Sequence, residues 1–151
     1  MPTLKEQLRA DLTSAMKSRD EARTRTLRMA LTSISNEEVA GNAARELTDD
    51  EVLKILGREA KRRREAATAF ADAGRAEQAA AERAEEDVLS AYLPAQLDDG
   101  ELQAIIAAAI AKTGASGPAG MGQVMKAVTP EIAGRAEGGR VAAVVRSMLS
   151  G

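Results

Sequence analysis

The chain has 151 residues, with 21 Lys or Arg and 23 Asp or Glu, so its formal net charge is −2. This balance excludes a strongly basic nucleic-acid wrapper and a polyacidic tail protein. Because the sequence contains no cysteine and no histidine, disulfide frameworks, Cys/His zinc sites, cysteine nucleophiles and histidine-based triads are excluded as well.

Residues that favour helix ends mark the limits of the first two predicted helices. Thr3 and Glu6 have the spacing of a capping box, which predicts a helix that starts at residue 4. The apolar stripe expected on this helix is Leu4, Leu8, Leu12 and Met16. A second helix is predicted over residues 20–40, with Gly41 as its C-terminal stop.

Two further helices complete the N-terminal part of the chain. Thr48 and Glu51 form a second capping box and open a long helix, which Gly74 is expected to end. Within this helix Glu59 and Arg63 share the apolar face at a separation of four residues, which we interpret as a packed ion pair. The fourth predicted helix is rich in alanine and glutamate.

A short segment after the fourth helix is interpreted as a hinge. Pro94 lacks a backbone N–H and cannot continue the helix. The hinge is placed at residues 94–98, and the residues that define it are Tyr92, Leu93, Pro94 and Gln96. We expect relative motion about it, because interfaces between such small bodies tend to be modest.

Three shorter helices are predicted beyond the hinge. Asp98 caps the first of them, and Gly114 ends it. The second covers residues 121–128 and is expected to stop or kink at Pro130. The third carries the apolar positions of residues 141–149.

The expected fold class is therefore all-α. We assign an N-terminal four-helix bundle to residues 1–93 and a small three-helix module with a thin core to residues 99–151. The longest apolar run, Ala104–Ala111, is far shorter than the roughly 20 residues that span a bilayer. The first residues show no export signal, so we expect a cytoplasmic protein with no membrane partner.

The chain shows no recognisable catalytic, cofactor or metal motif. The segment Gly117–Gly122 is not followed by the Lys-Ser/Thr pair of a phosphate-binding loop. A ferritin-like di-iron site needs Glu-x-x-His, and histidine is missing. A carboxylate-only Mg²⁺ site around Glu37-Glu38 or Glu85-Glu86-Asp87 is the alternative. We expect no enzymatic activity, no cofactor and no bound metal.

Basic residues are the remaining candidates for function. From Lys112 onward the sequence has five basic and two acidic residues. Three of the five lie among glycines near predicted helix ends, where cations and backbone N–H groups bind phosphate: Lys126, Arg135 and Arg140. A second candidate set lies on the long helix: Arg58, Arg62 and Arg64. The alternative for both sets is a solvated surface with helical ion pairs such as Lys61–Glu65.

Several motifs, in order and spacing, resemble those of the GatB/YqeY family from end to end. In the N-terminal part they are Leu27-Arg28-Met29-Ala30-Leu31, Asn36-Glu37-Glu38, Arg58-Glu59-x-Lys61-Arg62-Arg63, Phe70-x-x-Ala73-Gly74-Arg75 and Tyr92-Leu93-Pro94-x-Gln96-Leu97. In the C-terminal part they are Met121-Gly122-x-Val124-Met125-Lys126, Pro130 and Gly134-Arg135-Ala136-Glu137-Gly138. The chain departs from the family at Gly120, where many relatives have Asp, at Gln123, where many have a basic residue, and at Glu137, where Asp is commoner.

The resemblance implies a free-standing relative of the C-terminal helical and tail regions of the tRNA-dependent amidotransferase B subunit. In that enzyme the tail touches the tRNA body, while phosphorylation and amide transfer take place in other domains. The family is also associated with carbon–nitrogen ligase activity with glutamine as amido-N-donor, which no residue of this chain supports.

From this resemblance we expect an accessory protein that docks tRNA, or a complex containing an aminoacyl-tRNA synthetase or an amidotransferase. Phe70 and Tyr92 are the only aromatic residues, too few for a platform on which single-stranded RNA stacks. Contacts to RNA would therefore be made to phosphates and to folded shape. The alternative is a protein–protein helical adaptor that does not contact RNA.

Overall fold

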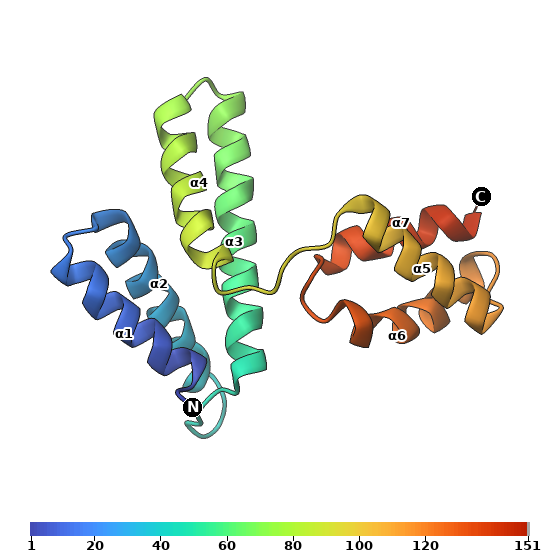
Figure 1. The fold of residues 1–151 in the computed structure, drawn as a ribbon, viewed down its shortest axis with the longest axis horizontal. Coiled ribbons are helices and arrows are strands. Elements are labelled where there is room, and N and C mark those ends of the chain that lie inside the picture. Colours follow the sequence, from blue (N-terminus) through green and yellow to red (C-terminus); the bar gives the residue numbers. More distant parts are fainter. Residues whose placement is uncertain (151) are drawn as a thin grey trace. The chain divides into compact units, whose positions relative to one another are not determined.

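The computed structural model describes residues 1–150, and all of the regular secondary structure in that range is helical, with no strand. Seven α-helices and one short 3-10 helix follow one another along the chain (Figure 1). The chain divides into two compact units, an N-terminal unit of residues 1–93 and a C-terminal unit that begins at Pro94. The all-α fold class is thereby confirmed.

Two helical hairpins make up the N-terminal unit. Its helices are α1 (Leu4–Lys17), α2 (Glu21–Glu38), α3 (Asp49–Asp72) and α4 (Ala76–Ser90). Helix α1 runs back along α2, and α3 runs back along α4 (Figure 1). Both hairpins contribute to one apolar core, whose largest fully buried side chains are Leu8, Leu27, Ile34, Val52, Leu56 and Leu89.

Capping boxes start two of these helices as expected. The Thr3 hydroxyl accepts the Glu6 backbone N–H, and the Glu6 carboxylate accepts the Thr3 N–H in return. Thr48 and Glu51 repeat the arrangement at the start of α3. Each box satisfies backbone donors that a helix start leaves unpaired, which is why these starts can be located from local sequence.

Two expectations for this unit are wrong. Met16 is 50% exposed, and Ala15 is buried in its place. A repeat of four residues drifts by about 40° per step on a helix of 3.6 residues per turn, so the buried stripe moves from position 16 to position 15. Helix α2 ends at Glu38, before Gly41. The Glu38 backbone carbonyl accepts the Arg45 N–H, so the chain has already turned.

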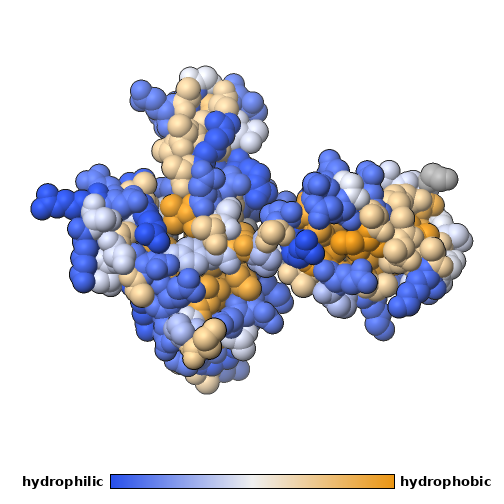
Figure 2. Space-filling model, in the orientation of Figure 1, coloured by the Kyte–Doolittle hydropathy of each residue, from blue (hydrophilic) through white to orange (hydrophobic). Residues whose placement is uncertain are grey.

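Three helices surround the core of the C-terminal unit. They are α5 (Asp99–Thr113), α6 (Met121–Ile132) and α7 (Gly138–Ser150), and the 3-10 helix η1 (Pro118–Gly120) precedes α6. The core contains Leu97, Leu102, Ile106, Val124, Val128, Val141 and Val145. Figure 2 shows hydrophobic residues gathered in the middle of this unit, with hydrophilic residues around them.

Helix α6 does not stop at Pro130. It continues to Ile132 and ends at Ala133 and Gly134, which both have positive φ. The missing proline N–H removes one hydrogen bond near the end of the helix. Ile132 is almost fully buried in the core of the unit, and this burial holds the last turn in helical form.

Gly120 has a structural reason to be glycine. It is buried where η1 meets α6, and a Cβ at this position would lie 2.8 Å from the Cβ of Ala115. Any larger residue, including the aspartate of many relatives, would force the Ala115 backbone to move. Helix α6 accordingly starts without a side-chain cap, and the 3-10 turn leads directly into it.

Candidate nucleic-acid interface

Arg135 and Arg140, two of the residues expected to contact phosphate, donate hydrogen bonds to the segment that joins the two units. Arg135 donates from Nε to the Ala95 carbonyl at 3.2 Å, and its own carbonyl accepts the Leu97 N–H at 2.8 Å. Arg140 donates from Nη1 to the Leu97 carbonyl at 2.9 Å and forms an ion pair with Asp99 at 2.7 Å. Of the five N–H donors of each guanidinium, Arg135 thus uses one and Arg140 uses two within the C-terminal unit.

The hinge residues belong to two different units. Tyr92 donates its hydroxyl hydrogen to Asp11 of α1, and Leu93 packs on the core of the N-terminal unit. Burial and the Asp11 carboxylate raise the pKa of Tyr92 to about 12, so the phenol stays protonated. Gln96 donates to the carbonyls of Pro94 and Gly134. Residues 95–98, assigned to the hinge, are therefore fastened to the C-terminal unit.

The charge of the C-terminal unit is balanced. From Pro94 onward the chain contains five basic and five acidic residues. The excess of cations counted from Lys112 onward omits Asp98, Asp99 and Glu101 at the start of α5, and Asp99 is the ion-pair partner of Arg140. Among the described residues Lys126 is exposed and has no ion-pair partner. Of Lys126, Arg135 and Arg140, it is therefore the residue whose side-chain N–H donors all face solvent.

On α3 Arg58 and Arg62 lie one turn apart on neighbouring positions of the helix, whereas Arg64 lies on another side. Arg58 is exposed and has no ion-pair partner within residues 1–150. Arg62 is 67% exposed and contacts Glu59 at 3.2 Å on the side nearer α2. Arg64 contacts Glu86 of α4 at 3.0 Å on the opposite side. The structure thus does not bring all three residues together.

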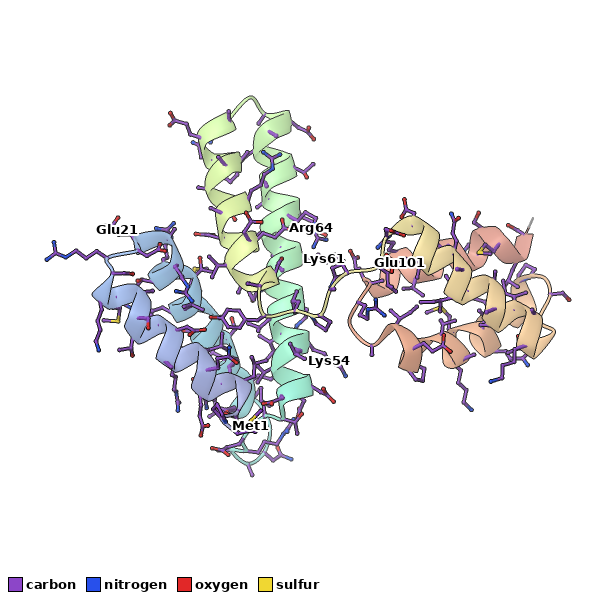
Figure 3. All side chains as sticks on the ribbon, viewed as in Figure 1. Met1, Glu21, Lys54, Lys61, Arg64 and Glu101 are labelled. Carbon is purple, nitrogen blue, oxygen red and sulfur yellow. The ribbon has the colours of Figure 1, made fainter. Side chains whose placement is uncertain are left out.

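Lys54 and Lys61 extend the surface around Arg58. Residues 54, 58 and 61 fall on one face of an α-helix, and Figure 3 shows Lys54 and Lys61 along the same side of α3. Lys61 lies 3.9 Å from Glu65, the ion pair expected from the sequence. We name Lys54, Arg58 and Lys61 the α3 basic face. Our sequence reasoning missed Lys54, although the i, i+4, i+7 spacing would have identified it.

An open groove of about 410 Å³ lies between α2 and α3, beside the α3 basic face. Its walls are Arg28, Met29, Thr32 and Ser33 from α2 and Glu59, Arg62 and Arg63 from α3. We name it the α2–α3 groove. Arg28 is exposed, and it donates a long hydrogen bond of 3.7 Å to the sulfur of Met16. Sequence reasoning did not place Arg28 opposite Arg62, because 34 residues separate them.

A partly buried ion network lies beneath this groove. Arg63 is 14% exposed and contacts Glu59 at 3.6 Å and Glu85 of α4 at 3.1 Å. Glu85 also binds Arg25 of α2 at 3.0 Å. The packed Glu59–Arg63 pair expected from the sequence is confirmed, and the network it belongs to links α2, α3 and α4. These ion pairs hold the side chains beneath the groove in place.

Residues 1–150 show neither a candidate metal cluster nor a candidate membrane span. No group of three or more acidic side chains is placed to hold a metal ion within this range. In the same residues no helix has both the length and the apolar character that a membrane crossing requires.

Comparison with protein families matches almost the whole chain to a family model. The model of a family described as Yqey-like protein matches residues 5–149. A search of curated proteins found no match. The expected resemblance is confirmed at the level of the family, over both units of the structure.

Proposed function

We propose that this chain, which belongs to the Yqey-like protein family, is a cytoplasmic accessory module that docks tRNA through its phosphates and folded shape. It acts alone or within a complex that charges tRNA or amidates the charged amino acid. The observation that carries the proposal is the α3 basic face beside a second pair of cations, Arg28 and Arg62, across the α2–α3 groove.

The chemistry of this surface suits an RNA backbone. Exposed lysines and arginines contact phosphates without reading sequence. Phe70 and Tyr92 are half-buried, so neither offers a free ring for base stacking. Lys126 adds a contact from the C-terminal unit. Arg135 and Arg140 can offer a phosphate only those guanidinium N–H groups that do not already bind Ala95 or Leu97.

Charge reversal on α3 tests the proposal. The Lys54→Glu/Arg58→Glu variant should lower the affinity for tRNA on the order of tenfold or more. The matched control is Arg75→Glu/Arg83→Glu, which changes the net charge equally at two exposed residues of the α3–α4 hairpin. Circular dichroism checks that both variants fold. Equal weakening by the two variants, or no tRNA binding by the wild type, would contradict the proposal.

A protein–protein adaptor is the second candidate, and the exposed methionines favour it. Met16 and Met29 are 50% and 41% exposed, and methionine suits adaptable protein contacts. Pull-down from a lysate with and without nuclease distinguishes the two functions. Partners recovered after nuclease treatment, and lost in the Met16→Lys/Met29→Lys variant, would support the adaptor. Recovery that depends on RNA supports docking of tRNA.

We also propose that the chain does not itself catalyse amide transfer. The sequence lacks cysteine and a phosphate-binding loop, so neither a thiol nucleophile nor a recognisable ATP site is available. Glutamate release from glutamine should stay at the level of a blank without protein. Release above that level that survives repurification would contradict this proposal.

A further inference from the structure

The α2–α3 groove is lined by two exposed arginines, by the partly buried Arg63 and by one carboxylate, that of Glu59. Arg28 reaches the groove from α2 and Arg62 from α3. Arg28 contacts a neutral sulfur, and Arg62 is largely exposed, so both guanidiniums keep N–H donors for a ligand. Two guanidiniums from different helices over one hollow form a site for an anion.

Glu59 makes this site better suited to an anion that also carries a hydrogen-bond donor than to a bare anion. Its carboxylate lines the groove and accepts the Ser33 hydroxyl hydrogen at 3.3 Å and an Arg62 N–H at 3.2 Å. A free phosphate between the arginines would meet this negative charge. A ligand that also carries a hydroxyl donor would instead offer the carboxylate a hydrogen bond. A free lone pair on Glu59 would accept it, because a carboxylate has about four acceptor positions.

A ribose-phosphate unit combines these two groups. Its phosphate is the anion for the arginines, and its 2′-hydroxyl is the donor for the carboxylate. The hydroxyls of Thr32 and Ser33 add polar groups to the wall of the groove. The groove of about 410 Å³ is open to solvent, so it can accept part of a continuing chain.

We propose that the α2–α3 groove binds one ribose-phosphate unit of an RNA backbone, with the phosphate between Arg28 and Arg62 and the 2′-hydroxyl donating to Glu59. This inference rests on the proposed function and deepens it. The α3 basic face contacts neighbouring phosphates of the same strand, while the groove distinguishes RNA from DNA by its 2′-hydroxyl. Arg28 is thus a binding residue, and Glu59 is a specificity residue.

The test uses three fluorescent hairpins of one sequence, made of RNA, 2′-O-methyl RNA and DNA. The 2′-O-methyl hairpin keeps the RNA helix form but has no 2′-hydroxyl donor, so it separates hydroxyl recognition from shape. Wild-type protein should bind the RNA hairpin several-fold more tightly than the 2′-O-methyl hairpin. Arg28→Glu should weaken RNA binding on the order of tenfold and abolish that preference, because the phosphate no longer enters the groove.

Arg75→Glu is the matched control, since it makes the same charge change at an exposed residue outside the groove. If Arg28→Glu binds RNA as Arg75→Glu does, while Lys54→Glu/Arg58→Glu still weakens binding, the groove inference fails and the proposed function stands. Equal wild-type affinity for RNA and 2′-O-methyl RNA also overturns the inference. If the wild type binds no hairpin, both proposals fail.

A free sugar phosphate carries the same phosphate and hydroxyl groups as an RNA backbone and is the alternative ligand. Ribose 5-phosphate is therefore titrated against the wild type and Arg28→Glu. Weak competition, only at concentrations far above those of the hairpin, supports an RNA backbone as the ligand. Saturable binding of ribose 5-phosphate that Arg28→Glu abolishes, without binding of the RNA hairpin, would overturn it.

Discussion

Arg140 donates from Nη1 to the carbonyl oxygen of Leu97 at 2.9 Å, 43 residues back along the chain. The side chain of Leu97 is buried in the core of the C-terminal unit, and its N–H is held by the Arg135 carbonyl. Both polar backbone groups of Leu97 are therefore satisfied, one by Arg140 within α7 and the other by Arg135 just before this helix. The relationship explains how an irregular segment can enter a small core without leaving unpaired polar groups.

Replacing Arg140 should destabilise the C-terminal unit. Arg140→Gln removes the ion pair with Asp99 and weakens the hydrogen bond to Leu97, at a cost of about 1–3 kcal/mol. Arg146→Gln is the control on the same helix, because Arg146 is exposed, and it should change stability by about 0.5 kcal/mol or less. Denaturant unfolding of the full chain measures both. Equal stability of the two variants would show that the contact with Leu97 contributes little.

Neighbouring arginines of α3 should differ in their effect on stability. Arg63 is partly buried between Glu59 and Glu85, so Arg63→Ala removes from both carboxylates their most buried cationic partner and should cost on the order of 3 kcal/mol. Arg62→Ala removes a largely exposed side chain and should cost about 1 kcal/mol or less. Thermal unfolding of the two variants makes the comparison. A larger loss for Arg62→Ala would contradict the structural role of the network.

Tyr92 should make stability depend on pH in the alkaline range. Burial and the hydrogen bond to Asp11 raise its pKa from the usual 10 to about 12. The folded state holds the phenolic proton more tightly, so this stabilisation is complete below about pH 10 and is lost as the pH rises towards 12. Tyr92→Phe should cost about 1 kcal/mol at pH 8. The stability gap between wild type and Tyr92→Phe should narrow above pH 10, and a constant gap would count against this hydrogen bond.

Limited proteolysis tests where the chain can open between its units. Residues 95–99 are held by hydrogen bonds to Arg135, Arg140 and Gly134, whereas Leu93 packs on the N-terminal unit. A protease of broad specificity should therefore cut first between residues 93 and 95. Leu97→Ala removes the buried anchor and should extend the cleaved region towards residue 99. First cuts within α3 would contradict the assignment of a hinge here.

Sequence located the features that depend on near neighbours. The capping residues Thr3, Thr48 and Asp98 were all identified, because the partner of each cap is three residues away. Gly114 ends α5 in the left-handed conformation that glycine favours. The Glu59–Arg63 pair was found for the same reason, since one helical turn brings these residues together.

Features that depend on distant segments could not be located in this way. The end of α2 depends on Arg45, which folds back onto Glu38. Arg140 was expected at a helix end on the surface, and its partners Leu97 and Asp99, about 40 residues away, could not be foreseen from its neighbours in sequence. The groove that joins Arg28 to Arg62 likewise exists only once the two hairpins pack. The sequence therefore identifies which residues are charged, but it does not show which distant residues they contact.

The salt dependence of tRNA binding tests the central claim most directly. Docking through phosphates releases counterions, so the logarithm of affinity should fall linearly with that of salt concentration, with a slope of about −0.9 per phosphate contact. About three contacts correspond to a loss on the order of tenfold to a hundredfold between 50 and 200 mM salt. Lys54→Gln/Arg58→Gln should make the slope shallower by about 2, while Arg75→Gln/Arg83→Gln leaves it unchanged. A wild-type slope near zero, or equal slopes in the two variants, would contradict docking through the α3 basic face.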